Sequence, residues 1–167
     1  MKDNIFRIAE LDMKIQFAES TTNNEQLIES FEPFRVSALK GSILFHLTVD
    51  DNTRPYPKEK RERIRNFDTG SGHTIVDKLD DGGYQFIIRD IYDADCALVI
   101  ANADFSECRC ALNGNMNMRR FGLNNTLMLI YAFASCPYDT LMIHASLVRQ
   151  NGYGYAFIAK SGSVLSI

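Results

Sequence analysis

A run of strand-like segments in the middle of the chain constrains its fold more than any other feature. The segments are rich in β-branched and aromatic residues, and they cover residues 74–79, 84–89, 97–101 and 107–112. Asp80-Asp81-Gly82-Gly83 supplies a hairpin turn between the first two, and Asn102-Ala103-Asp104 links the last two. The sequence therefore predicts an antiparallel β-meander.

The amino-terminal part adds further strands and a short helix. Residues 5–17 alternate loosely between apolar and polar side chains, which predicts one or two strands. A short helix is expected from Glu25, capped by Asn23 or Asn24 and limited by Pro33. Residues 42–49 predict another strand, and residues 50–59, with two prolines, predict a long loop.

A second helix is expected over residues 123–135. Asn124 or Asn125 can cap it, and Pro137 ends it. Residues 127–134 are apolar on every face of such a helix, so we expect it to be buried on several sides.

A hairpin follows this helix. Residues 140–148 and 153–158 flank Gln150-Asn151-Gly152, and Asn-Gly is among the strongest hairpin signals. Truncation after this hairpin would leave its strand edges without neighbours, and exposed edges pair readily with other chains. We therefore expect a homo-oligomer.

The chain as a whole is predicted to have an α+β fold. The polar stretch over residues 113–120 is the best internal boundary. It separates an amino-terminal antiparallel β-rich domain, residues 1–115, from a second part, residues 116–167, that holds the buried helix and the hairpin.

The last nine residues begin like a phosphate-binding loop. Such a loop follows a strand and has the pattern GxxxxGK[ST], because its glycines let backbone N–H groups surround the phosphates while the lysine neutralises their charge. Here Ala159 and Val164 occupy the two glycine positions, and Leu165 occupies the lysine position. The remaining candidates for a vestigial nucleotide site are Lys160, Ser161, Gly162, Ser163 and Ser166.

Three segments carry a family resemblance: FGLNNTLML at residues 121–129, LMIHAS at residues 141–146, and GYAFIAKSG at residues 154–162. Together they resemble the HPr kinase and ATP-type phosphoenolpyruvate carboxykinase superfamily, in particular the carboxykinase-like proteins of gut bacteria. In that family the third segment approaches SGTGKST, and a long catalytic region with metal-binding acids follows. The resemblance implies that residues 116–167 begin a P-loop kinase-like core, and it sets His144 near the phosphate loop.

The same resemblance implies an ancestral ATP-dependent phosphoryl transfer with Mg²⁺, to a protein serine or to a small carboxylate. Because Val164 and Leu165 remove the glycine and the lysine, we expect a truncated, catalytically inactive relative that uses no cofactor itself. Two alternatives stay open. One is a regulatory module that binds a ligand or a protein and uses the hairpin for oligomerisation, and the other is a gene fragment produced by a change of reading frame.

Charge and hydropathy limit the classes of partner that this chain is expected to bind. The net charge of −3 and the pI near 5.6 argue against a nucleic-acid surface. The basic cluster over residues 58–65 contains acidic residues, so we expect a solvated loop or strand edge there, whereas Arg119 and Arg120 are a candidate anion site. The longest apolar run, residues 127–134, is shorter than the ~20 residues of a membrane span. The amino terminus lacks signal-peptide features, so we expect a cytoplasmic protein.

Cysteines and histidines predict no metal site. The four cysteines do not form a CxxC pair, and the three histidines are scattered, so reduced and mostly buried thiols are expected. Cys108 and Cys110 should point the same way from one strand. His46 lies in the middle of a predicted strand, where a half-buried structural histidine is expected.

Overall fold

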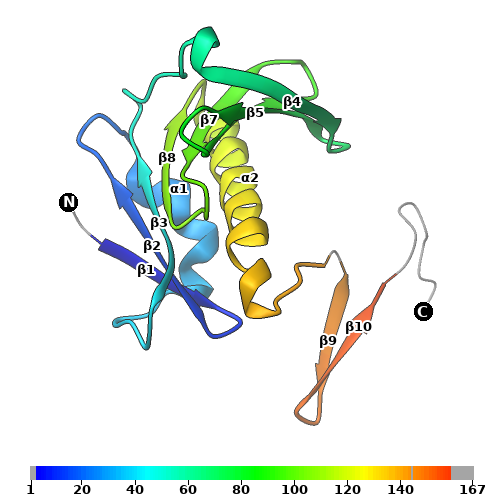
Figure 1. Cartoon of the computed structure of the whole chain (residues 1–167). Helices are drawn as coiled ribbons and strands as arrows, with labels where there is room; N and C mark the ends of the chain where they lie inside the picture. The colour runs from blue at the N-terminus through cyan, green and yellow to red at the C-terminus, as the bar shows by residue number, and fades with distance from the viewer. Residues whose placement is uncertain (1–2, 144, 159–167) are drawn as a thin grey trace.

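The computed structural model describes residues 3–143 and 145–158, and the main element of this part of the chain is one large sheet. The sheet has eight strands in the order β1-β2-β3-β8-β7-β6-β5-β4. These strands are β1 (Asp3–Ile8), β2 (Leu11–Phe17), β3 (Ile43–Val49), β4 (Arg61–Asp68), β5 (Gly72–Leu79), β6 (Tyr84–Asp90), β7 (Asp95–Ala101) and β8 (Glu107–Leu112). With the helices described below, the fold is α+β, as the sequence predicts (Figure 1).

The predicted antiparallel meander is confirmed and comprises β4 to β8. The turn between β5 and β6 shows why its sequence suits it. Gly82 adopts a positive φ of 88°, which costs glycine little, and the Asp81 carboxylate accepts a hydrogen bond of 2.8 Å from the Gly83 backbone N–H.

The first three strands join the meander through two parallel pairs. β1 and β2 form an antiparallel hairpin, whereas β2 pairs with β3, and β3 with β8, in parallel. The connection from β2 to β3 contains the short helix α1 (Asn24–Ile28) and the 3₁₀ segment η1 (Glu29–Phe34). Asn23 occupies the N-cap position of α1, but its side chain caps nothing. The strand patterns predicted these strands without indicating their parallel pairing.

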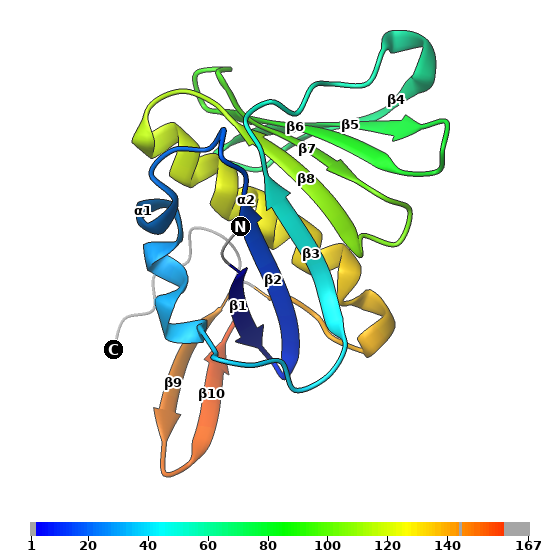
Figure 2. The same ribbon diagram turned by 90° about the vertical axis from the view of Figure 1, so that its left-hand side faces the viewer.

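The long helix α2 (Met116–Ala134) covers one face of the sheet, and the hydrophobic core lies between the two. Figure 2 shows α2 behind the strands and α1 at their left-hand side. From the helix, Leu123 and Ile130 are fully buried, and from the sheet, Phe45, Leu47 and Val99 are fully buried. The boundary proposed at residue 116 thus coincides with the start of a helix that packs on the sheet of the amino-terminal part.

The expected limits of this helix are wrong at its beginning. It starts at Met116, seven residues before the predicted Leu123, and Asn115 is its N-cap, accepting hydrogen bonds from the N–H groups of Asn117 and Met118. The proposed caps Asn124 and Asn125 lie inside it. The polar first turns are compatible with a packed helix because their arginines reach acceptors on neighbouring segments.

The expectation of burial on several sides is also wrong. Only one face of α2 is buried, and Met128 on the opposite face is 55% exposed; Phe133, near the end of the helix, is 51% exposed. Phe133 still stacks on Phe105, with ring centroids 4.8 Å apart. The sheet covers the inner face of this helix together with α1, whose Leu27 and Ile28 belong to the same core.

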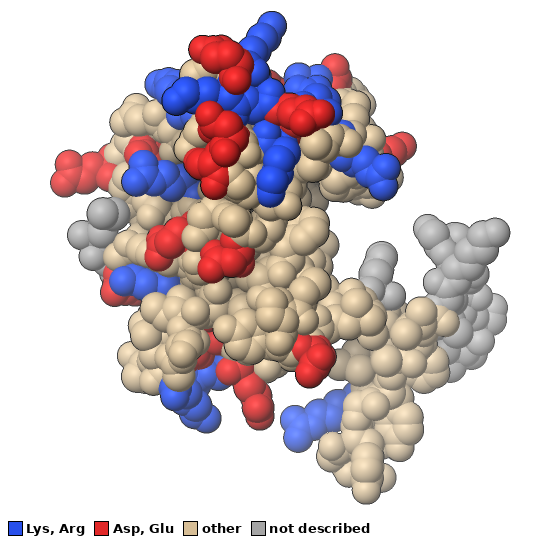
Figure 3. Space-filling model, in the orientation of Figure 1, with Lys and Arg blue, Asp and Glu red and all other residues tan. Residues whose placement is uncertain are grey.

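The predicted Asn-Gly hairpin is present as β9 (Ser146–Gln150) and β10 (Tyr153–Phe157), which follow the 3₁₀ segment η3 (Cys136–Tyr138). The first strand is shorter than expected, because residues 140–143 lie outside any strand. Every residue of the two strands is exposed, and the hairpin extends away from the body (Figure 1). In the space-filling view this arm is mostly uncharged, whereas basic and acidic side chains are intermixed near β4 (Figure 3).

Candidate functional site

The candidate site lies on the face of the sheet that α2 does not cover. Strand alternation places Phe45, Leu47 and Val49 of β3 toward the helix, and therefore His46 and Thr48 on the opposite face. In β8, buried cysteines alternate with exposed charged residues in the same way. The parallel register sets Glu107 beside His46 and Arg109 beside Thr48. Two neighbouring strands thus present polar side chains side by side.

A loop over residues 50–57 forms the wall of the site, and it is attached at both ends. At its start, Asp51 accepts hydrogen bonds from the backbone N–H of Leu112 (3.2 Å) and from the guanidinium of Arg119 (2.8 Å). At its end, the backbone N–H of Tyr56 donates to the buried Gln85 (2.8 Å), and its hydroxyl donates to Asp81 (3.1 Å). The wall is therefore held in place by the sheet itself.

A buried carboxylate fastens the segment that follows the loop. Asp77 of β5 is 1% exposed and accepts hydrogen bonds from Arg61 and Arg63 of β4 and from Gln85 of β6. Burial by itself raises the pKa of Asp77, but the hydrogen bonds from Arg63 and Arg61 outweigh it and hold the pKa below its usual value. Asp77 is thus charged at neutral pH and joins three strands.

Between this wall and the strands lies an open hollow of about 690 Å³. Residues of β3, β7 and β8 form its floor, and the loop and the β5–β6 turn form its wall. The lining includes His46, Thr48, Asp50, Asn52, Arg54, Tyr56, Asp81, Ile100, Asn102, Glu107 and Arg109. It is predominantly polar, and both signs of charge are present.

Arg109 differs from the other charged residues of the hollow. Its side chain makes no hydrogen bond or ion pair within the part of the chain that the structure describes. A hydrogen bond from Ser20 lowers the pKa of the nearby Asp50, and the charge of Arg109 lowers it further. Two of the three carboxylates, by contrast, have a hydrogen-bond donor: Ser20 for Asp50 (2.7 Å) and Tyr56 for Asp81. A guanidinium on the sheet face is thus available to an acceptor from outside.

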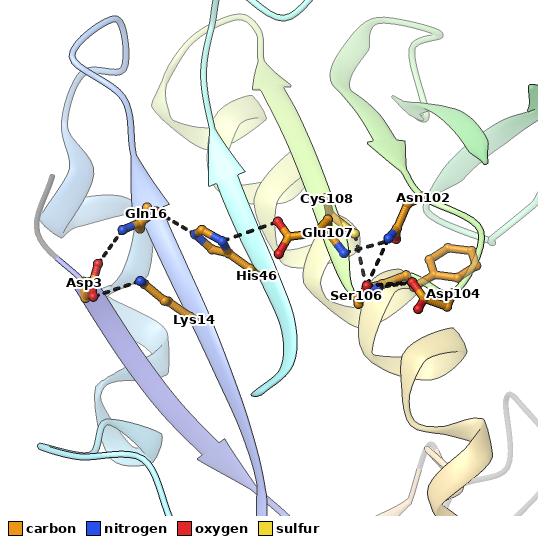
Figure 4. A network of polar contacts seen from close by, with 10 residues as sticks. Asp3, Lys14, Gln16, His46, Asn102, Asp104, Ser106, Glu107 and Cys108 are labelled. Atoms are coloured by element: carbon orange, nitrogen blue, oxygen red, sulfur yellow. Dashed lines mark hydrogen bonds and ion pairs between the residues drawn. The ribbon is translucent and has the colours of Figure 1, made fainter. Parts of the chain in front are cut away.

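A polar network crosses the strands at one side of the hollow (Figure 4). Gln16 donates to Asp3, and its carbonyl oxygen lies 2.6 Å from Nε2 of His46, so Nε2 is the donor in this contact. On its other side, Nδ1 of His46 lies 3.4 Å from the Glu107 carboxylate. His46 is therefore a half-buried, hydrogen-bonded histidine, as expected.

The two cysteines of β8 are unreactive thiols at neutral pH. Cys108 and Cys110 point toward the core from one strand, as predicted, and burial raises the pKa of each thiol to about 12. Cys96 is also buried, and Cys136 is exposed. All four are free thiols. The two thiols of β8 stay protonated at neutral pH and do not supply a nucleophile.

The structure separates the two arginines of the candidate anion site. Arg119 is 9% exposed and binds the Leu112 carbonyl and Asp51, whereas Arg120 reaches the Gln26 carbonyl and Glu29 on the side of α1. Each binds a different part of the protein, so they form no joint site. The remaining predicted site residues, His144, Lys160, Ser161, Gly162, Ser163 and Ser166, lie outside the described residues.

Sequence reasoning did not single out Arg109, Thr48 or Tyr56. One signal was available: Glu107 and Arg109 alternate with two cysteines, which is typical of a strand with one buried and one polar face. The parallel pairing that sets this face beside His46 joins segments about 60 residues apart, and no local pattern encodes it.

Neither a metal site nor a membrane-spanning helix is indicated in the described part of the chain, and no family match points to a function. Within residues 3–143 and 145–158, no group of three or more His, Cys, Asp or Glu side chains could hold a metal ion. No helix in that part of the chain combines the length and apolar character needed to cross a membrane. No protein-family model matches the chain, and no similar protein was found among curated proteins or solved structures.

Proposed function

We propose that this chain is a non-catalytic, cytoplasmic ligand-binding protein, with its ligand site in the hollow on the open sheet face. The observation that carries the proposal is Arg109, a guanidinium without a protein acceptor among the described residues, at the floor of a pre-formed polar hollow. Ligand sites commonly combine a preformed concavity with a few convergent polar groups. The attached loop supports such preorganisation, since a rigid wall lowers the entropic cost of binding.

We further propose descent from the HPr kinase and phosphoenolpyruvate carboxykinase-like superfamily. The order of elements supports it: α2 contains residues 121–129 of the resemblance, and β10 leads toward the residues that resemble the phosphate loop. The substitutions Val164 and Leu165 favour a protein without phosphoryl transfer, because the transferred phosphate would lack its lysine.

A second proposed role concerns the hairpin, which would pair with the same hairpin of a second copy. Its two strands pair only with each other in the described structure, and they expose Leu147, Val148 and Tyr155. Light scattering over a concentration series tests this role. A dimer that dissociates in a Leu147→Ser/Tyr155→Ser variant is expected, and a monomer at every concentration would contradict it.

Thermal unfolding tests the ligand-binding proposal. The native chain is screened with small polar metabolites, alongside Thr48→Tyr, which fills the floor, and Ile64→Tyr, which adds the same ring to an exposed site on β4. A ligand at ten times its Kd stabilises by about 1.4 kcal/mol, or roughly 3–6 °C. We expect this shift in the native chain and the Ile64 variant only. An equal shift in Thr48→Tyr would place the ligand elsewhere.

Calorimetry with ATP and Mg²⁺ tests the proposed loss of nucleotide chemistry. We expect no binding by the native chain, and the Val164→Gly/Leu165→Lys double variant tests whether those two side chains account for the loss. Micromolar binding by the native chain would overturn the non-catalytic proposal and indicate a nucleotide sensor.

A further inference from the structure

We infer that the ligand of this hollow is a small zwitterion that carries one carboxylate and one ammonium group, the simplest case being a free α-amino acid. The inference rests on the proposed function, namely that the hollow is a ligand site. The charged groups that line the hollow, and the partners that these groups already have, support the assignment.

The anionic end of the ligand is assigned to Arg109. Its guanidinium has the planar donor arrangement that binds a carboxylate through two hydrogen bonds. Arg54, on the wall, makes its hydrogen bonds through Nη1 alone, to the backbone carbonyls of Asp51 (3.0 Å) and Thr53 (3.2 Å). These contacts hold Arg54 at the rim of the hollow and neutralise none of its charge.

The cationic end is assigned to Glu107. It lies two residues before Arg109 on the same face of β8, and such positions are separated by about 6.8 Å along a strand. Its side chain is 69% exposed, and its one ion-pair partner among the described residues, His46, is at the long distance of 3.4 Å. A carboxylate and a guanidinium at this spacing can engage the two neighbouring charged groups of one amino acid.

The charge balance of the lining argues against a purely anionic ligand. Asp50, Asp81 and Glu107 face the same hollow as Arg54 and Arg109, so three carboxylates accompany two guanidiniums. A polyanion such as a nucleotide would gain from the arginines and be repelled by the acids. A zwitterion has no net charge and satisfies groups of both signs, which favours it over either a dianion or a simple amine.

The test is calorimetric titration of the native chain with the twenty common free amino acids, and with acetate, methylammonium, succinate and inorganic phosphate as comparison probes. Two variants remove one charge each, Arg109→Gln and Glu107→Gln. Their matched controls are Arg65→Gln and Glu62→Gln, which remove the same charges from exposed positions of β4 outside the hollow. Circular dichroism verifies that all four variants are folded.

We expect at least one amino acid to bind the native chain more tightly than any single-charge probe. Its affinity should fall about tenfold or more in each hollow variant, as expected for loss of a charge-assisted hydrogen bond, and stay unchanged in both controls. Succinate or phosphate binding that is abolished by Arg109→Gln and strengthened by Glu107→Gln would overturn the zwitterion while leaving the ligand site intact. If no metabolite in the thermal screen binds, both the proposed ligand site in the hollow and the zwitterion inference are overturned.

Discussion

Replacing Asp77 by asparagine should show how strongly the buried carboxylate fastens β4 to the sheet. The Asp77 side chain is 2% exposed and accepts from Arg61, whose side chain is 16% exposed, and from Arg63, which is 51% exposed. Asparagine keeps the size of the side chain and removes its charge. Both arginines then lose their ionic acceptor, and water can replace it at Arg63 far more readily than at Arg61.

The cost follows from the exposure of the two arginines. A hydrogen bond between charged groups contributes about 1.5–3 kcal/mol when it is buried, and this range applies to Arg61. The half-exposed Arg63 can recover water, so its share is about 0.2–1 kcal/mol. We therefore expect Asp77→Asn to lower the free energy of unfolding by about 2–4 kcal/mol. With a slope of about 2 kcal/mol per molar urea, the midpoint should fall by roughly 1–2 M.

Urea unfolding at several pH values provides the assay and its internal check. Because the pKa of Asp77 is lowered in the folded state, its contribution is fully present above the unfolded pKa, near 4, and is lost as the pH falls through the folded pKa. The difference between native chain and variant should thus be constant near pH 7 and shrink below about pH 4. Asp80→Asn, in the adjacent turn, is the control and should change stability by no more than about 0.5 kcal/mol. A loss in Asp77→Asn as small as in this control would refute the reasoning.

Three further changes test the packing of the body. Gly122→Ala should lower the free energy of unfolding in urea by about 1–3 kcal/mol, although alanine has the better helix propensity. The reason is that a Cβ at this position would lie 2.6 Å from a carbonyl oxygen of β7. Increased stability would contradict this close approach. Asn115→Ala should cost about 1 kcal/mol in the same assay, since it removes the cap of α2, and an unchanged midpoint would show that the cap contributes nothing. In a thiol-labelling assay at pH 8, the exposed Cys136 should react rapidly. Cys108 and Cys110 should react only on unfolding, because burial raises the pKa of each thiol to about 12. Rapid labelling of all three would show that the core opens readily.

The local elements of the fold were predictable because local interactions decide them. The turn at residues 80–83 and the Asn151-Gly152 turn have side chains and φ values that suit the observed hairpins, and both hairpins were predicted. The start of α2 was missed because Arg119 and Arg120 make its first turns polar, and their acceptors come from distant parts of the chain. The P-loop-like residues and the family they resemble stay a prediction.

The sequence by itself determined where most of the strands lie, that the thiols are mostly buried, and that Cys108 and Cys110 share a face, since alternation along a strand is a property of neighbouring residues. Only the tertiary structure decided that β3 pairs in parallel with both β2 and β8. That pairing joins distant segments, and it alone sets His46 and Thr48 beside Glu107 and Arg109. The loop over residues 50–57 then closes the hollow because Asp51 and Tyr56 find partners on three other elements. These contacts form only when the sheet is packed, so no single stretch of the sequence predicts them.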